Sequence, residues 1–159
     1  MGLWFRLTRT AAGAAAVAAT VVHGITLRAA GGGLIGGDAG GYAGGGLAFA
    51  AGQYTEIEPG IVATISAFGL FGGASARIYF ADDFNAGLRP YTTAGGGYGV
   101  YFGGGTGAAA PFGRAGFGLD IRPEYWQRTA FVEACAFSVP GQDGASFMVL
   151  IAAGMRLYL

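Results

Sequence analysis

The chain has 159 residues, of which 33 are glycine, 53% are hydrophobic and only 11% are charged. A disordered chain needs high charge and few aromatic residues, and a soluble domain carries roughly twice this share of charge, so both classes fit poorly. The nine basic residues, all arginine, balance nine acidic ones, which leaves no positive field to attract nucleic acid. We therefore expect a medium other than water to cover part of the protein.

The first 23 residues have the pattern of a secretory signal. Arg6 and Arg9 give a positive start, residues 10–22 form a stretch of small apolar residues, and Ala16-Val17-Ala18 offers a cleavage site. The stretch is shorter than the ~20 residues that a membrane-spanning helix needs. We expect cleavage in the native host, and the alternative is a retained helix that lies at the membrane interface or against the barrel. Residues 24–159 are predicted to form one domain.

After residue 23, polar and apolar side chains alternate with period two, which is typical of β-strands. Between Phe112 and Arg122 one parity holds the charged residues and the other holds only apolar ones. Residues 74–81 and 146–159 repeat the pattern. The apolar parity is predicted to face lipid and includes Ile78, Phe80, Phe117, Leu119, Ile121, Val149 and Ile151.

Turn residues divide the chain into eight segments. The predicted strands are residues 24–32, 41–51, 54–68, 74–82, 90–102, 111–122, 128–139 and 146–159, and the outer connections are expected near 33–40, 69–73, 103–110 and 140–145. Strands that cross a membrane need ~9–11 residues, and only helices and closed barrels pair their whole backbone in lipid. The sequence therefore predicts an all-β fold, an eight-stranded antiparallel up-and-down transmembrane β-barrel.

Charged residues fall on the parity that such a barrel would turn inward. Eight strands enclose an interior that side chains just fill, and an unpaired charge there is costly. Glu58 is an expected partner for the arginines, while inward glycines (Gly95, Gly97, Gly99, Gly116 and Gly118) are expected to leave room for long side chains. The alternative is a set of surface salt bridges on a soluble sandwich. The candidate lumen charge network comprises Arg28, Arg77, Arg114, Asp120, Arg122, Glu133 and Arg156.

Several segments resemble the OmpA/OmpX-like family of small outer-membrane β-barrels. Arg89-Pro90-Tyr91 with residues 95–102 is similar to the fifth strand of that family, and residues 112–123 and 131–134 are similar to its sixth and seventh strands. The ending Gly154 to Leu159 is similar to the C-terminal signal that the barrel assembly machinery recognises, with leucine in place of the usual phenylalanine. The resemblance covers residues 74–159 well and residues 24–73 poorly. It implies an outer-membrane location, with membrane lipids and the barrel assembly machinery as partners.

Motifs for catalysis or cofactor binding are weak. Residues 31–36 satisfy G-x-G-x-x-G, but the glycines that follow are poorly suited to begin the helix that a dinucleotide site needs. The single His23 and the single Cys135 have no companions for a metal site, and no histidine in the barrel region could activate a serine. Glu56 and Glu58 share a parity as an acid–base pair would, but beside Pro59 we interpret them as a solvated turn. No cofactor, metal or enzymatic activity is predicted.

Three functions fit these patterns. The favoured one is a structural outer-membrane barrel with a filled lumen, and short connections lower the expectation of ligand recognition at its tips. A lipid or small apolar ligand-binding barrel, including a soluble cup, is the second, and a self-assembling barrel that forms sheets or filaments is the third. A soluble cup requires the opposite orientation, with Phe117 inward and Arg114 and Asp120 in water.

Overall fold

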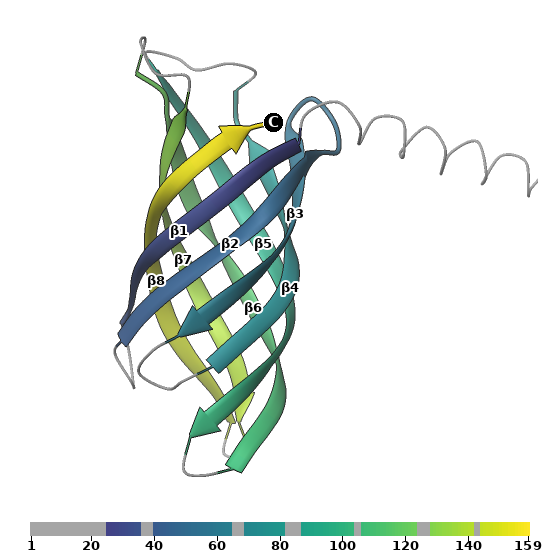
Figure 1. The fold of residues 1–159 in the computed structure, drawn as a ribbon, viewed down its shortest axis with the longest axis vertical. Coiled ribbons are helices and arrows are strands. Elements are labelled where there is room, and N and C mark those ends of the chain that lie inside the picture. Colours follow the sequence, from purple (N-terminus) through teal and green to yellow (C-terminus); the bar gives the residue numbers. More distant parts are fainter. Residues whose placement is uncertain are drawn as a thin grey trace, which may run out of the picture.

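The computed structural model describes residues 25–35, 40–64, 69–81, 87–103, 106–123, 128–141 and 144–159. Each strand pairs antiparallel with the next, and β1 also pairs with β8, so the sheet closes into a barrel (Figure 1). The predicted fold class is confirmed, whereas the signal-like residues 1–23 lie outside the described residues. The strands are β1 (Ile25–Ile35), β2 (Gly40–Ala50), β3 (Thr55–Thr64), β4 (Gly69–Tyr79), β5 (Leu88–Gly103), β6 (Thr106–Ile121), β7 (Thr129–Gly141) and β8 (Gly144–Tyr158).

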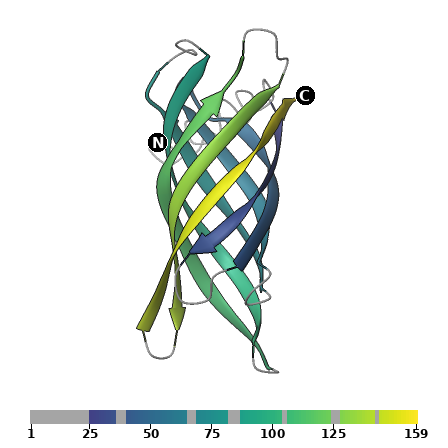
Figure 2. The same cartoon turned by 90° about the vertical axis from the view of Figure 1, so that its left-hand side faces the viewer.

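The two ends of the barrel differ. At the end that we call the terminal end, β1 begins and β8 finishes; at the opposite end, the hairpin end, β1 joins β2 and β7 joins β8 (Figures 1 and 2). Strands β5 to β8 have between 13 and 16 residues, whereas β1 to β4 have 10 or 11. The wall made by the longer strands therefore extends further at the hairpin end, as Figure 1 shows for β5 and β6.

One of the expected outer connections is wrong, and two others lie where they are expected but are shorter. Residues 69–73 form the first part of β4, and residues 103–110 and 140–145 belong mostly to β5 to β8. Their glycine and alanine content predicts a break in the sheet, yet the backbone pairs with the neighbouring strand, Gly69 with Tyr101 and Gly103 with Thr106. In a closed sheet, strand pairing decides the conformation and overrides the weak strand preference of glycine.

Side chains alternate between the two faces of the wall, in the orientation that the sequence predicts. Phe117 points outward and is 70% exposed, whereas Asp120 points inward and is fully buried. Ile78, Phe80, Val149 and Ile151 are also exposed, and Leu119 and Ile121 are half-buried on the same outward parity. None of the outward positions in the described strands carries a charged residue.

A row of inward-facing glycines crosses four adjacent strands. Gly46 pairs with Gly60, Gly60 with Gly73, and Gly73 with Gly97. A Cβ atom at Gly60 would lie 2.8 Å from the carbonyl oxygen of Gly45, so the neighbouring backbone already occupies that space. The glycines therefore let the sheet bend tightly toward the lumen at this row.

The expectation that inward glycines make room for arginines is wrong. A Cβ at Gly99 would collide with the ring of Phe71, and one at Gly118 would collide with the ring of Tyr91. At Gly95, Gly97 and Gly116 the nearest atoms belong to residues of the adjacent strand. The glycines accommodate aromatic rings and close strand packing, which the alternation pattern does not reveal.

The glycine row predicts a position-dependent cost of adding one methyl group. Gly60→Ala should lower the free energy of unfolding by about 1–3 kcal/mol, because its Cβ meets backbone that cannot move independently. Gly72→Ala is the matched control, since an outward Cβ there has no atom within 4 Å. Urea unfolding of both variants in liposomes measures the difference, and equal stability of the two would refute the bend.

Candidate functional site: the barrel interior

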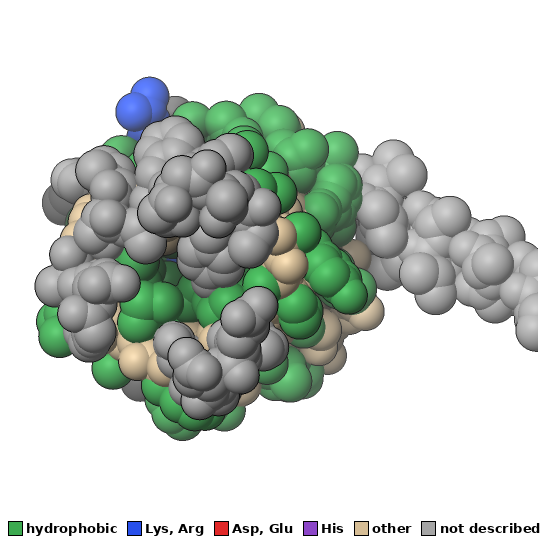
Figure 3. All heavy atoms as spheres, turned by 90° about the horizontal axis from the view of Figure 1, so that it is seen from below, with side chains coloured by type: hydrophobic (Ala, Val, Ile, Leu, Met, Phe, Trp, Pro, Cys, Tyr) green, Lys and Arg blue, Asp and Glu red, His purple; other side chains and the backbone are tan. Residues whose placement is uncertain are grey.

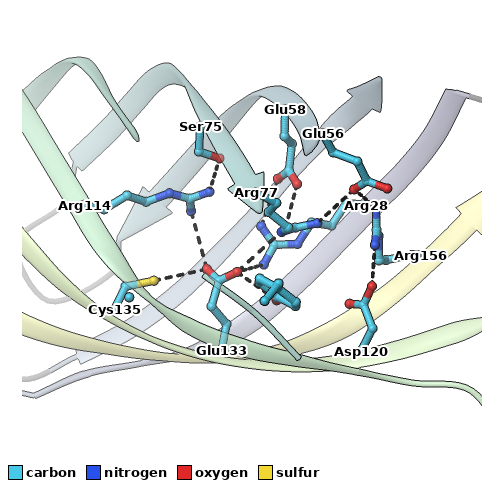
Figure 4. Close-up of polar contacts among 12 residues, drawn as sticks. Arg28, Glu56, Glu58, Ser75, Arg77, Arg114, Asp120, Glu133, Cys135 and Arg156 are labelled. Atoms are coloured by element: carbon cyan, nitrogen blue, oxygen red, sulfur yellow. Dashed lines mark hydrogen bonds and ion pairs between the residues drawn. The ribbon is translucent and has the colours of Figure 1, made fainter. Parts of the chain in front are cut away.

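The interior gathers charged side chains from six strands (Figure 4). Six of the seven residues of the candidate network lie inside the barrel: Arg28, Arg77, Arg114, Asp120, Glu133 and Arg156. Arg122, the seventh, is exposed just beyond the end of β6. It shares the parity of Asp120, but β6 ends at Ile121, so inward parity no longer implies burial.

Glu133 of β7 is the centre of a first group of ion pairs. Its carboxylate lies 3.1 Å from the guanidinium of Arg28, 3.7 Å from that of Arg77 and 3.9 Å from that of Arg114. The hydroxyl of Tyr91 donates a hydrogen bond of 3.0 Å to the same carboxylate. One carboxylate thus faces three arginines that come from β1, β4 and β6.

Glu58 of β3 supplies the second negative charge of this group. It accepts a hydrogen bond of 2.9 Å from Arg28, and its other oxygen lies 2.7 Å from Nη2 of Arg77. Arg114 instead donates a 2.6 Å hydrogen bond to the hydroxyl of Ser75. Three arginines therefore meet two carboxylates, which leaves a local excess of one positive charge.

A second group surrounds Arg156 of β8 and has the opposite excess. Arg156 forms ion pairs with Glu56 and Asp120 and donates a hydrogen bond to the hydroxyl of Tyr79. Arg77, 3.8 Å from Glu56, joins the two groups. Counting both groups, four arginines face four carboxylates, so the formal charges of these eight residues sum to zero. That balance matters because a buried charge without a partner costs several kcal/mol, of the order of 3–5 when one partner is removed.

The positions of two interior carboxylates contradict the prediction that they lie in a solvated turn. Glu56 and Glu58 lie within β3, and Glu58 is only 6% exposed, so the pair is not a solvated turn. In register, Glu56 pairs with Arg77 and Glu58 with Ser75. Their shared parity was the available signal, and the neighbouring Pro59 obscured it by suggesting a strand boundary. Tyr79 shares the inward parity of Arg77, which is a sequence signal for its place in the network.

The hairpin half of the lumen is apolar. The rings of Phe71, Phe112 and Phe137 pack together with centroid distances of 5.3 to 5.5 Å, two contacts being edge-on and one stacked. Buried side chains of β1, β2, β7 and β8 surround them, namely Leu34, Tyr42, Val139 and Leu150. The interior is therefore filled in two layers, with charges toward the terminal end and aromatic rings toward the hairpin end.

A cavity with a volume of about 30 Å³ lies where the two layers meet, lined by Arg28, Tyr42, Glu58, Ser75, Phe112 and Arg114 among others. Ligand pockets usually have ~300–1,000 Å³, so this space accommodates at most a few waters. In the part of the chain that the structure describes, no cluster of His, Cys, Asp and Glu could hold a metal ion. The described residues also contain no helix long and apolar enough to cross a membrane.

Comparisons with known proteins support the fold. No protein-family model and no curated protein matches the chain. Among solved structures, the N-terminal β-barrel domain of Pseudomonas aeruginosa OprF matches with a TM-score of 0.60 and 16% identity, over 84% of this chain and 97% of that one. Neisserial surface protein A matches with a TM-score of 0.64 and 12% identity, over 84% and 95%. A de novo designed transmembrane β-barrel matches with a TM-score of 0.53 and 17% identity, over 84% of this chain and 95% of that one.

The expected likeness to OmpA/OmpX-like barrels is thus confirmed as a likeness of fold. Identities of 12 to 17% carry no further information about activity. Any functional inference for this chain has to come from its own walls and interior.

The ion pairs predict that a substitution which unbalances the interior charge lowers the stability of the barrel. Glu133→Gln should lower the free energy of unfolding by about 3 kcal/mol or more, because Arg28, Arg77 and Arg114 then lose the carboxylate that they share. Adding Arg114→Met removes one of those arginines and should recover part of the loss. Chemical unfolding in liposomes gives both values. A double variant that is less stable than Glu133→Gln would contradict the charge-balance account.

Proposed function

We propose that the protein is a structural barrel of the outer membrane whose filled interior passes no solute and performs no chemistry. The observation that carries this proposal is the separation of charge between the two faces of one wall. Every charged residue within the described strands, Arg89 of β5 included, lies on the inward parity, and no described outward strand position is charged. An outer wall without charged side chains is suited to contact with the hydrocarbon of a membrane and not with water.

The outer wall supports contact with lipid in a second way. Figure 3, seen from the hairpin end, shows mostly hydrophobic side chains on the described part of that face, with a basic group at the rim and no acidic ones. Exposed aromatic side chains occur toward both ends, with Tyr98 and Phe147 in the hairpin half and Tyr54 at the terminal end. Tyrosine and other aromatic rings favour the boundaries between water and lipid in membrane barrels.

The filled lumen supports a structural role rather than transport or catalysis. The aromatic layer and the charged layer both occupy the bore, and an eight-stranded barrel has little width beyond what side chains fill. The proteins with a similar fold, OprF and Neisserial surface protein A, are outer-membrane barrels, which agrees with this proposal.

The alternative functions receive less support. A soluble cup needs charges outside and apolar residues inside, whereas Arg156 and Asp120 are buried and Phe117 is exposed. An apolar ligand inside the barrel would need a larger cavity than the one between the two layers. Self-assembly into sheets or filaments has no observation in its favour. Membrane lipids and the barrel assembly machinery are the partners that an outer-membrane barrel requires.

The filled bore predicts electrical silence. Wild-type protein in a planar bilayer should show no steady conductance above that of the empty membrane. The variant with Phe71→Ala and Phe137→Ala should be silent as well, because the charged layer still occupies the terminal half. A large, stable, porin-like conductance of the wild type would refute the structural role.

The lipid-facing wall predicts a cost that depends on depth. Ile151→Arg, at an exposed position in the middle of β8, should destabilise the barrel in liposomes by ~2–4 kcal/mol, the cost of arginine at the bilayer midplane. Leu159→Arg is the control, because a charge at the terminal rim costs ~0–1 kcal/mol. If both substitutions cost the same in liposomes, the proposed placement in the membrane fails.

A further inference from the structure

The inward face of the described strands carries one more arginine than carboxylates. The two groups of ion pairs hold four of each, and Arg89 of β5 is a fifth inward arginine. The central carbon of its guanidinium lies 3.8 Å from the centre of the Tyr79 ring, and the hydroxyl of Tyr79 bonds to Glu56 and Asp120. Arg89 therefore lies beside the second group and offsets its negative excess. The positive excess of the first group remains.

This excess is localised at Arg114. Its guanidinium is 3.9 Å from Glu133, whereas Arg28 and Arg77 each approach a carboxylate oxygen more closely, to 2.9 Å and 2.7 Å. Figure 4 shows Arg114 between Glu133 and Ser75, and its hydrogen bond of 2.6 Å goes to the neutral hydroxyl of Ser75. The side chain of Arg114 is only 9% exposed, so water does little to stabilise its charge.

The cavity between the charged and aromatic layers lies beside Arg114, and its polar side chains are mainly hydrogen-bond donors. Because Ser75 accepts a hydrogen bond from Arg114, its own hydroxyl hydrogen is left for another acceptor. Nε of Arg28, also in the lining, is buried and has no hydrogen-bond partner among the described residues. Glu58 is the one carboxylate among the described lining residues, and its two oxygens already face Arg28 and Arg77. The side chains of the lining thus offer positive charge and donors to an occupant, but few acceptors.

The size and charge of the cavity together select the occupant. Its volume of about 30 Å³ exceeds the ~10–15 Å³ that one water needs, yet holds only a single atom or a very small molecule. Water accepts hydrogen bonds from these donors but brings no charge, whereas a halide accepts them and also neutralises the excess at Arg114. We propose that the cavity binds one chloride ion, held by Arg114, Arg28 and the hydroxyl of Ser75. The ion is a structural ligand, because the aromatic layer and the charged layer occupy the bore on its two sides.

The chloride dependence of folding tests the proposal. A ligand that binds only the folded state raises the folding equilibrium constant, and a tenfold increase in a saturating ligand raises it about tenfold. The wild type is unfolded by urea in liposomes while sodium chloride replaces sodium gluconate, an anion too large for the cavity. Ionic strength stays constant in this series, so the screening of charges does not change. The folding constant should rise with the chloride concentration.

Three variants connect this dependence with the cavity. Arg114→Met removes the excess charge and should abolish the chloride dependence, and Ser75→Ala removes one donor and should weaken it. Thr93→Val is the matched control, because Thr93 is another buried residue with a hydroxyl, 1% exposed, and is not part of the cavity lining. It should keep the chloride dependence of the wild type.

Diffraction from wild-type crystals grown in bromide gives an independent result that needs no variant to fold. An anomalous peak of bromide in the cavity is expected. Density without an anomalous signal there would show water alone and would overturn the proposal, as would a folding constant of the wild type that is independent of chloride. An undiminished chloride dependence of Arg114→Met would overturn it as well. Failure of the wild type to enter liposomes would instead contradict the proposed function, and bromide crystals grown in detergent would still decide on the chloride site.

Discussion

Pairing of β1 with β8 is the constraint on which the rest of the structure depends. It runs from Thr26 and Tyr158 to Ile35 and Val149, and it removes the free edges that an open sheet of this length would expose. Once the sheet is closed, alternation sends each side chain either to the lumen or to the outer wall. Eight strands enclose a narrow bore, so the inward residues must fill the available space and balance one another's charge.

The two layers of the lumen meet this constraint by different means. Phe71, Phe112 and Phe137 fill the hairpin half as an aromatic core, in the way that a soluble domain is filled. The terminal half holds arginines and carboxylates, whose desolvation offsets much of their attraction. The ion pairs of that half therefore add little net stability. They restrict the interior to the one side-chain arrangement in which every charge has a partner of opposite sign. Inward glycines such as Gly60 then allow the wall to bend closely around both layers.

Alternation in the sequence was sufficient to predict the fold and the direction of most side chains. The segment from Phe112 to Arg122 identifies β6, and the burial of Asp120 beside exposed Phe117 follows from parity alone. Position along the barrel axis was not predictable in the same way, because it depends on the stagger between strands. For this reason the sequence predicts an inward Arg122, which lies beyond the strand end, and a turn at Glu56, which contacts Arg156. The aromatic layer is not predictable from one segment, because its rings come from β4, β6 and β7 and meet only in the folded barrel.

The central claim is that lipid surrounds the outer wall of the barrel. The accessibility of spin labels along β7 tests this claim most directly. Single labels at each position from Val132 to Phe137, in protein that carries Cys135→Ser at the other sites, would be exposed to oxygen, which concentrates in lipid, and to a water-soluble nickel chelate. The account predicts a period of two, with high oxygen and low nickel accessibility at Val132, Ala134 and Ala136, and low accessibility to both reagents at the inward positions. High nickel accessibility at Val132, Ala134 and Ala136 in liposomes would show that water covers this wall and would contradict the account.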